Sequence, residues 1–275
     1  AVSQEELLAL WNRAGALYAR GKWAKAATLY ERVGLEVPPG DTLATMAHFR
    51  LAECYFGQKS QLQAAREFRK VSDDAPTARL APEALLRAGD AYADLWRRPE
   101  LDPTYGQTAL ATYQELLSRY PDAPAAARAR LRISELEEMF ARKDFKTATY
   151  YYRLKAYDSA ILYLKDIAAS YPRASVTPQV LLTLVHAYQK VNYAEDVAET
   201  CGYIRRYHPA TPGVDQVCPV GQDTAAAARE RGATLSRRPV PCEGSTRMGR
   251  CESRLTAGTT ARSSVLREKS ENVRT

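Results

Sequence analysis

Side chains capable of acid–base or metal chemistry are few in this 275-residue chain, and they are scattered. Each of the three histidines, His48, His186 and His208, stands alone in a helical pattern, and none has a cysteine or carboxylate at a recurring metal-ligand spacing. Adjacent carboxylates such as Glu137 and Glu138 lie next to each other and not across a pocket, as acid–base catalysis requires. No phosphate-binding loop, nucleophile elbow or zinc-protease motif occurs. The sequence therefore predicts no metal, no cofactor and no enzyme activity.

The five cysteines do not have the spacing of a disulfide framework. Cys54 and Cys201 fall at helical positions where a small apolar residue packs, whereas Cys218, Cys242 and Cys251 lie near the C-terminus. Pairing within that C-terminal part is possible but is not specified by the spacing. Because the total is odd, at least one thiol is expected to be free or intermolecular if the chain is exported.

Charge and aromatic content divide the chain near residue 213. Residues 213–275 contain 11 Lys or Arg against 7 Asp or Glu and therefore carry +4 of the net +7, which leaves a mildly basic body. All 25 aromatic residues precede this segment, and without large apolar side chains a segment cannot offset its ordering entropy. We therefore predict that 210–275 is a disordered tail whose arginines are solvating charge, not a nucleic-acid-binding arm.

The body, residues 1–209, repeats one pattern of small, aromatic and apolar residues that ends on proline. The clearest copy is LAECYFGQKSQLQAAREFRKVSDDAP, which ends at Pro76, and the stretch YYYRLKAYDSAILYLKDIAASYP, ending at Pro172, has the same spacing. This spacing is typical of tetratricopeptide repeats of about 34 residues. A third copy carries the insertion RRPELDPTYGQ. The predicted repeats cover about 5–38, 45–76, 82–121, 123–172 and 178–209.

Each repeat is expected to form two antiparallel helices that pack closely through small residues. Gly89 and Ala148 supply such positions on first helices, and Ala109 and Ala160 supply them on second helices. The closing prolines end the second helices because proline lacks a backbone donor and restricts the preceding residue. The predicted fold is all-α: a right-handed α-solenoid of five helix pairs followed by the tail. Tyrosines such as Tyr151 are interpreted as packing residues and not as a cofactor site.

First helices line the concave surface of such a solenoid, and their inward positions combine arginines with aromatic residues. Arginine and aromatic side chains dominate the energetics of many interfaces, so this surface is predicted to bind an extended peptide or the edge of another domain. Candidate residues in the first three repeats are Arg13, Phe49, Arg50, Phe56, Arg87 and Asp90. In the fourth and fifth repeats they are Arg142, Lys146, Tyr152, Arg153, His186 and Lys190.

The inserted loop and the segment after it resemble the BamD family, the lipoprotein subunit of the outer-membrane β-barrel assembly machinery. The likeness rests on an Asp-Pro loop at 102–103, Tyr-Pro at 120–121, a long helix from about 123 into a tyrosine-rich helix at 147–153, and a second Tyr-Pro at 171–172. It extends over roughly 5–209 and is most specific over 100–172. The tail resembles nothing in that family.

The resemblance implies a non-enzymatic scaffold without cofactors at the periplasmic face of the outer membrane. Its anchor would be an N-terminal lipidated cysteine that precedes Ala1 of this chain. Repeats over about 123–209 would dock on a BamA-like barrel protein, next to other subunits of the machinery, through the second set of candidate residues. Repeats over about 5–95 would capture C-terminal segments of unfolded outer-membrane proteins, with the first set forming hydrophobic slots and arginine sites for a terminal carboxylate.

Three other functions fit the repeat pattern less well. A soluble periplasmic adaptor of the cell-division coordinator kind would carry a coiled-coil segment before the repeats, and none is found from Ala1 onward. A cytosolic chaperone adaptor would need Lys and Asn pairs on the first helices, which only Asn12 and Arg13 approach. A solenoid supporting a cell-wall-cleaving enzyme would need a catalytic domain after residue 213. The periplasmic adaptor remains the main alternative.

Overall fold

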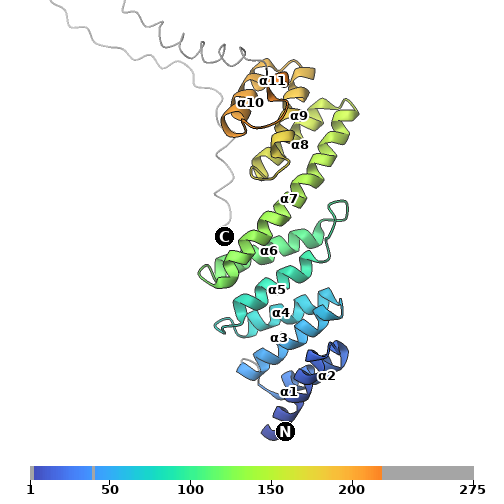
Figure 1. The fold of residues 1–275 in the computed structure, drawn as a ribbon, viewed down its shortest axis with the longest axis vertical. Helices are drawn as coiled ribbons and strands as arrows, with labels where there is room; N and C mark the ends of the chain where they lie inside the picture. Colours follow the sequence, from blue (N-terminus) through green and yellow to red (C-terminus); the bar gives the residue numbers. More distant parts are fainter. Residues whose placement is uncertain (1–2, 39–40, 219–275) are drawn as a thin grey trace, which may run out of the picture. The chain divides into compact units, whose positions relative to one another are not determined.

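The computed structural model describes residues 3–38 and 41–218, and every regular element in this part is an α-helix (Figure 1). All of it lies within one compact unit, residues 1–230. The helices are α1 (Gln4–Ala19), α2 (Trp23–Glu36), α3 (Thr42–Gly57), α4 (Gln61–Asp74), α5 (Ala81–Ala93), α6 (Thr104–Arg119), α7 (Pro124–Arg153), α8 (Tyr157–Ser170), α9 (Thr177–Lys190), α10 (Ala194–Tyr207) and α11 (Val214–Val217).

Consecutive helices pack in pairs, and each pair contacts the next along the chain. The pairs α1–α2, α3–α4, α5–α6, α7–α8 and α9–α10 correspond to the five predicted repeats. Small residues lie at the predicted close contacts, since Ala26, Ala64, Ala109 and Ala160 are all fully buried. The predicted all-α solenoid of helix pairs is therefore confirmed.

Four of the five pairs share one turn that reverses the chain. In the first pair the N–H of Lys22 donates to the carbonyl of Leu17 (3.0 Å). Gly21, which lies between the C-cap residue Arg20 and Lys22, has a φ of 68°. The same bond closes α3, α7 and α9, as in a Schellman motif. Only the first pair has glycine at the left-handed position; the others use Lys59, Lys155 and Asn192, with φ of 60–65°.

Replacing Lys59 or Lys155 by glycine should stabilise the fold by about 0.5–1 kcal/mol. Both side chains are exposed, and a left-handed conformation costs an L-residue roughly 1–2 kcal/mol that glycine avoids. Urea denaturation of each variant measures the change. Gly21→Ala is the matched control and should lower stability by a similar amount; equal stabilities for all three variants would contradict this account of the turn.

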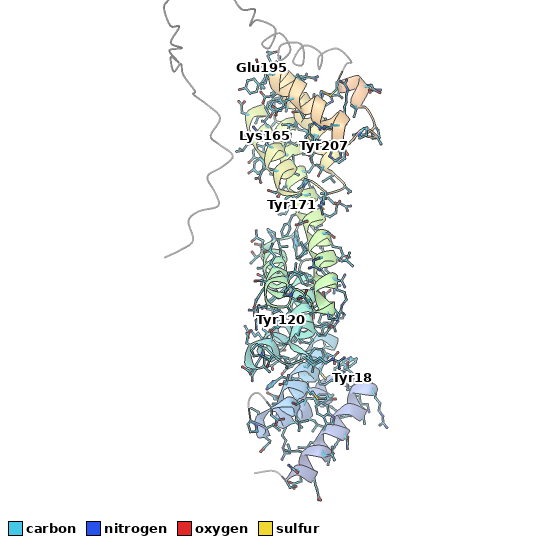
Figure 2. The ribbon with its side chains drawn as sticks, turned by 90° about the vertical axis from the view of Figure 1, so that its left-hand side faces the viewer. Tyr18, Tyr120, Lys165, Tyr171, Glu195 and Tyr207 are labelled. Carbon is cyan, nitrogen blue, oxygen red and sulfur yellow. A yellow bond between two sulfur atoms is a disulfide. The ribbon has the colours of Figure 1, made fainter. Side chains whose placement is uncertain are left out.

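The tyrosines of the two Tyr-Pro pairs, Tyr120 and Tyr171, make contacts between neighbouring repeats. The hydroxyl of Tyr120 donates to the carbonyl of Pro76 (2.9 Å), which ends the preceding repeat. The ring of Tyr171 stacks on Phe140 of α7, with centroids 6.4 Å apart and planes at 12°. Both tyrosines lie beside the turns that follow a second helix (Figure 2). The tyrosine before each proline thus has a packing role between repeats.

The 30-residue helix α7 belongs to two core clusters. Its first half packs through Ala129 and Leu136 with residues of α5 and α6. Its second half packs through Ala141 and Ala148 with residues of α8, α9 and α10. Phe140 lies between the two halves, with its ring centroid 4.5 Å from that of Trp96, the residue just before the inserted loop. The predicted long helix that runs into the tyrosine-rich segment is therefore one continuous helix.

The ordered chain continues past the predicted boundary at Pro209. Residues 210–218 form a turn and the short helix α11, and Cys201 of α10 forms a disulfide with Cys218. Cys201 packs in the core cluster at a helical position, as predicted, but its pairing with Cys218 was not predicted, and the assignment of Cys218 to a disordered tail was wrong. Both sulfur-bearing residues are buried, whereas Cys54 is a free, buried cysteine. The predictions for residues 219–275, including Cys242 and Cys251, lie outside the described residues.

Candidate functional site

The first three repeats bring aromatic and arginine side chains of successive first helices together. On α3, the Arg50 guanidinium forms an ion pair with Glu53 (2.7 Å) and lies 5.1 Å from the ring centroid of Tyr18 on α1. The Tyr18 hydroxyl donates to the same carboxylate (3.2 Å). Burial and then Glu53 raise the pKa of Tyr18, so it stays a donor. The charge of Arg50 is thus matched within the protein.

Arg87 of α5 is arranged differently. Within the described part of the chain its guanidinium lies against aromatic rings and forms no ion pair. Its guanidinium lies 4.9 Å from the centroid of Phe56 and 5.8 Å from that of Phe68. Phe49 packs edge-on against Phe68 at 5.3 Å. Contacts with rings use none of the guanidinium N–H donors in ion pairs, so these donors can bind a carboxylate of a partner. We call Phe49, Phe56, Phe68 and Arg87 the Arg87 cluster; it unites three predicted site residues.

Asp90, one turn further along α5, is occupied by two internal donors. It accepts from the Tyr113 hydroxyl of α6 (2.8 Å) and from Arg132 Nε of α7 (3.2 Å). Tyr113 is fully buried, and burial followed by the Asp90 charge raises its pKa. Asp90 therefore joins three helices. Arg13 is exposed on α1, outside the Arg87 cluster.

Arg142 and Lys146 of the second predicted set share one cleft. Its volume is about 560 Å³, and α7 and the inserted loop form its walls. Lys146 lies 3.4 Å from Glu100 of that loop, and Arg142 pairs with Glu138 (2.8 Å). The lining residues are Pro99, Glu100, Arg142, Lys143, Lys146, Thr147 and Tyr150. Three cations against one lining carboxylate, next to an exposed tyrosine, suit an acidic partner surface.

The other members of the second set lie elsewhere. Tyr152 packs edge-on against Tyr157 of α8, with centroids 5.4 Å apart, and Arg153 is exposed at the end of α7. His186 and Lys190 are exposed on α9 and do not line the cleft. Within the tyrosine run, Tyr151 stacks on Tyr163 at 5.2 Å, while Tyr150 stays 60% exposed. The run therefore combines packing with one exposed ring.

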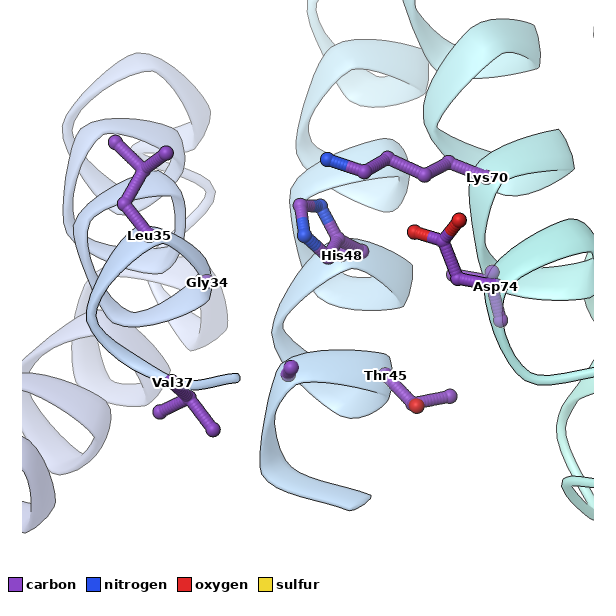
Figure 3. A pocket seen from close by; sticks show the side chains of 9 residues that line it. Gly34, Leu35, Val37, Thr45, His48, Lys70 and Asp74 are labelled. Carbon is purple, nitrogen blue, oxygen red and sulfur yellow. The ribbon is translucent and has the colours of Figure 1, made fainter. Parts of the chain in front are cut away.

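A smaller pocket of about 190 Å³ opens between α2, α3 and α4 (Figure 3). Lys70 and Asp74 of α4 both extend toward His48, whose Nδ1 is 2.9 Å from Glu67. Apolar residues such as Leu35 form the opposite wall. Among the described residues no group of three or more His, Cys, Asp or Glu side chains could hold a metal ion.

Two contacts at the candidate surface could not be found from the sequence. Arg132 was not a candidate because its partner Asp90 lies 42 residues earlier, in another repeat. Tyr18 fitted the repeat pattern, which gives no sign that its hydroxyl reaches Glu53, 35 residues away. Within the described ranges, no helix is both long enough and apolar enough to cross a bilayer.

Two of the solved structures to which this chain is similar are tetratricopeptide domains. The TPR2AB domain of yeast Sti1 in its pHSP90 complex covers 84% of this chain and 87% of its own at a TM-score of 0.45 and 13% identity. The TPR domain of P58(IPK) covers 82% of this chain and 56% of its own at a TM-score of 0.42 and 15% identity.

Sequence relatives are outer membrane protein assembly factors named BamD. The Vibrio cholerae protein is 30% identical over 103 residues, which is 38% of this chain and 43% of the relative. The Neisseria gonorrhoeae protein is 28% identical over 111 residues, which is 40% of this chain and 42% of the relative. The Xylella fastidiosa protein is 25% identical over 193 residues, which is 65% of this chain and 64% of the relative. The chain thus spans less than half the length of the first two relatives.

The family model YfiO, described as an outer membrane lipoprotein, matches residues 4–203. This range contains α1 to α9 and most of α10, and with them every predicted site residue. The chain belongs to the YfiO family of outer membrane lipoproteins.

Proposed function

We propose that this protein is a non-enzymatic scaffold of the outer-membrane β-barrel assembly machinery. It docks on a BamA-like barrel protein and captures C-terminal segments of unfolded outer-membrane proteins. The observation that carries the proposal is the family match over residues 4–203, since it covers all five helix pairs. An N-terminal lipid would hold the protein at the periplasmic face of the outer membrane. The Cys201–Cys218 disulfide supports that location, because disulfides persist in the periplasm and are rare in the cytosol.

Substrate capture is assigned to the Arg87 cluster. An extended segment with a free carboxylate would pair with Arg87 and place apolar side chains against Phe49 and Phe56. Arg50 contributes less to carboxylate binding because Glu53 already neutralises it. Asp90 supports the site by holding α5 to α7.

Docking on the barrel protein is assigned to the cleft between α7 and the inserted loop, with Arg153, His186 and Lys190 as further contacts. Lys146 is 71% exposed, so its contact with Glu100 is a weak surface pair that an acidic partner group would replace at little cost. The exposed ring of Tyr150 adds apolar area next to these cations.

The double reversal Lys146→Glu, Arg153→Glu should reduce capture of the barrel protein about tenfold or more. Opposite charges then become like charges across the interface, which costs several kcal/mol. Arg142 is left intact because its partner Glu138 also accepts from the backbone N–H of Ser175 (2.6 Å). The measurement is a pull-down by the chain from detergent-solubilised outer-membrane proteins of the bacterium that encodes it.

Arg130→Glu is the matched control for this pull-down. Arg130 is exposed on the same helix α7 and lies outside the cleft, so its reversal should leave capture unchanged. Failure of the wild-type chain to capture any barrel protein with periplasmic domains would overturn the proposed function. Equal capture by all variants would leave the function but remove the cleft from the docking surface.

A further inference from the structure

The repeat spacing continues one step beyond the fifth repeat. Helix α11 begins at Val214, at the same offset from Pro209 as α9 has from Pro172 and α5 from Pro76. It contacts both α9 and α10, as the first helix of a sixth repeat would. The family match ends at residue 203, before this segment. Residues 210–218 therefore stand in the place of a further repeat and cover the end of the solenoid; we call them the C-terminal cap.

Three kinds of contact hold the C-terminal cap. Val214 and Cys218 are buried in the core cluster of α8, α9 and α10. The Gln189 amide of α9 donates to the Val217 carbonyl (3.1 Å), and the Arg205 guanidinium of α10 donates to the Cys218 carbonyl. The disulfide joins Cys218 to Cys201 of α10, with Cα atoms 5.6 Å apart. Only the last of these bonds depends on the redox state of the chain.

The disulfide contributes more to the stability of this short helix than it would to that of a long helix. An isolated four-residue helix has no stability of its own, because helix formation needs a costly nucleus. Apart from the disulfide, this short helix is held by the buried Val214 and two hydrogen bonds, so we expect the covalent link to supply much of what keeps the cap in place. Both cysteines are about 1% exposed, and a thiol can attack the bond only after the cap has opened.

We propose that the C-terminal cap is locked by oxidation and that it closes the end of the solenoid only after the chain has left a reducing compartment. A dithiol–disulfide oxidase is the class of oxidant required. The Cys218 thiolate attacks the oxidase disulfide and expels one of its thiolates; the Cys201 thiolate then attacks the mixed disulfide and expels the other. The protein loses two protons and two electrons, and the oxidase leaves as a dithiol. The inference goes beyond the scaffold role, since it holds whatever the solenoid binds.

The pairing is tested by alkylating the unreduced full-length chain in denaturant and mapping its tryptic peptides by mass. The expected result is one linked species that joins peptide 191–205, which holds Cys201, to peptide 207–229, which holds Cys218. Cys54 should be alkylated only after unfolding, because burial raises the pKa of its thiol to about 12. Linkage of Cys201 to Cys242 or Cys251, or a free Cys201, would overturn the proposal.

The lock is tested by hydrogen exchange on the wild-type chain with and without reductant, and on the double variant Cys201→Ala, Cys218→Ala. Amides of α11 should exchange roughly tenfold faster or more once the bond is absent, while those of α1 to α6 stay unchanged. Cys54→Ala keeps the disulfide and is the control for loss of a buried sulfur. Continued protection of α11 after complete reduction would refute the lock even if the pairing is correct.

Dependence on compartment is tested in cells by acid quenching followed by the same peptide map. The chain produced with an export signal should carry the linked peptides, and the chain produced in the cytosol should carry two free thiols at Cys201 and Cys218. Equal linkage in both compartments would contradict the timing in the proposal. Because no barrel protein is needed in these assays, they can fail independently of the pull-down.

Discussion

Replacing Phe140 with alanine should lower the free energy of unfolding by about 3–5 kcal/mol, the largest single effect that we expect. Phe140 is 6% exposed and packs against Trp96, just before the inserted loop, and Tyr171 at the end of α8. Its removal leaves a cavity. The helix α7 cannot shift locally to fill this cavity, because it is continuous and both of its halves are packed in the core. Thermal and urea unfolding followed by circular dichroism give the change.

Leu131→Ala on the same helix is the control for this substitution. Leu131 is 65% exposed, so its truncation removes little buried area and should cost less than about 0.5 kcal/mol. Similar losses for the two variants would contradict this account, because alanine is the better helix former at both positions and only the lost packing around Phe140 should lower stability.

Replacing Gly106 with alanine should destabilise the protein by about 1–3 kcal/mol, although alanine is the better helix former. A Cβ at residue 106 would overlap the ring of Trp96. That ring is 1% exposed, and its indole N–H donates to the carbonyl of Leu101 (3.3 Å), so it has no room to move. Denaturation measures the loss, and a red shift of tryptophan emission would report exposure of Trp96.

Gly202→Ala is the opposite control. Gly202 lies within α10, and no atom comes within 4 Å of a Cβ added there. The substitution should therefore raise the free energy of unfolding by about 1 kcal/mol through helix propensity alone. If Gly106→Ala were also stabilising, the close packing of Trp96 against α6 would not be the reason for glycine in the inserted loop motif.

The sequence was sufficient to predict what depends on local spacing. Small residues such as Ala109 and Ala160, and the closing prolines, recur at fixed offsets, so helix pairs and their buried faces follow from the pattern. The aromatic and arginine positions of the first helices followed from the same offsets. Phe49, Phe56 and Arg87 do meet in one cluster.

Interactions between repeats could not be predicted in this way. Part of the environment of an arginine comes from residues far away in the sequence: Arg132 reaches Asp90 in another repeat. The Tyr18 ring beside Arg50 belongs to α1, although the ion-pair partner of Arg50, Glu53, is only three residues away. The disulfide was missed for a related reason. Absence of aromatic residues argued against order after residue 213, but a buried valine, the disulfide and hydrogen bonds from Gln189 and Arg205 hold one more helical turn.

The continuous helix α7 also changes how this solenoid behaves as a chain of coupled units. In most repeat proteins each unit contacts only its neighbours, and stability is a sum of unit energies and nearest-neighbour terms. The contacts of α7 are also with adjacent repeats, but one continuous 30-residue helix makes them all: it packs with α5 and α6 of the third repeat, with α8 of the fourth and with α9 of the fifth. We therefore expect the three repeats from α5 to α10 to unfold together as one cooperative unit, whereas α1 to α4 keep the ordinary coupling between neighbouring repeats.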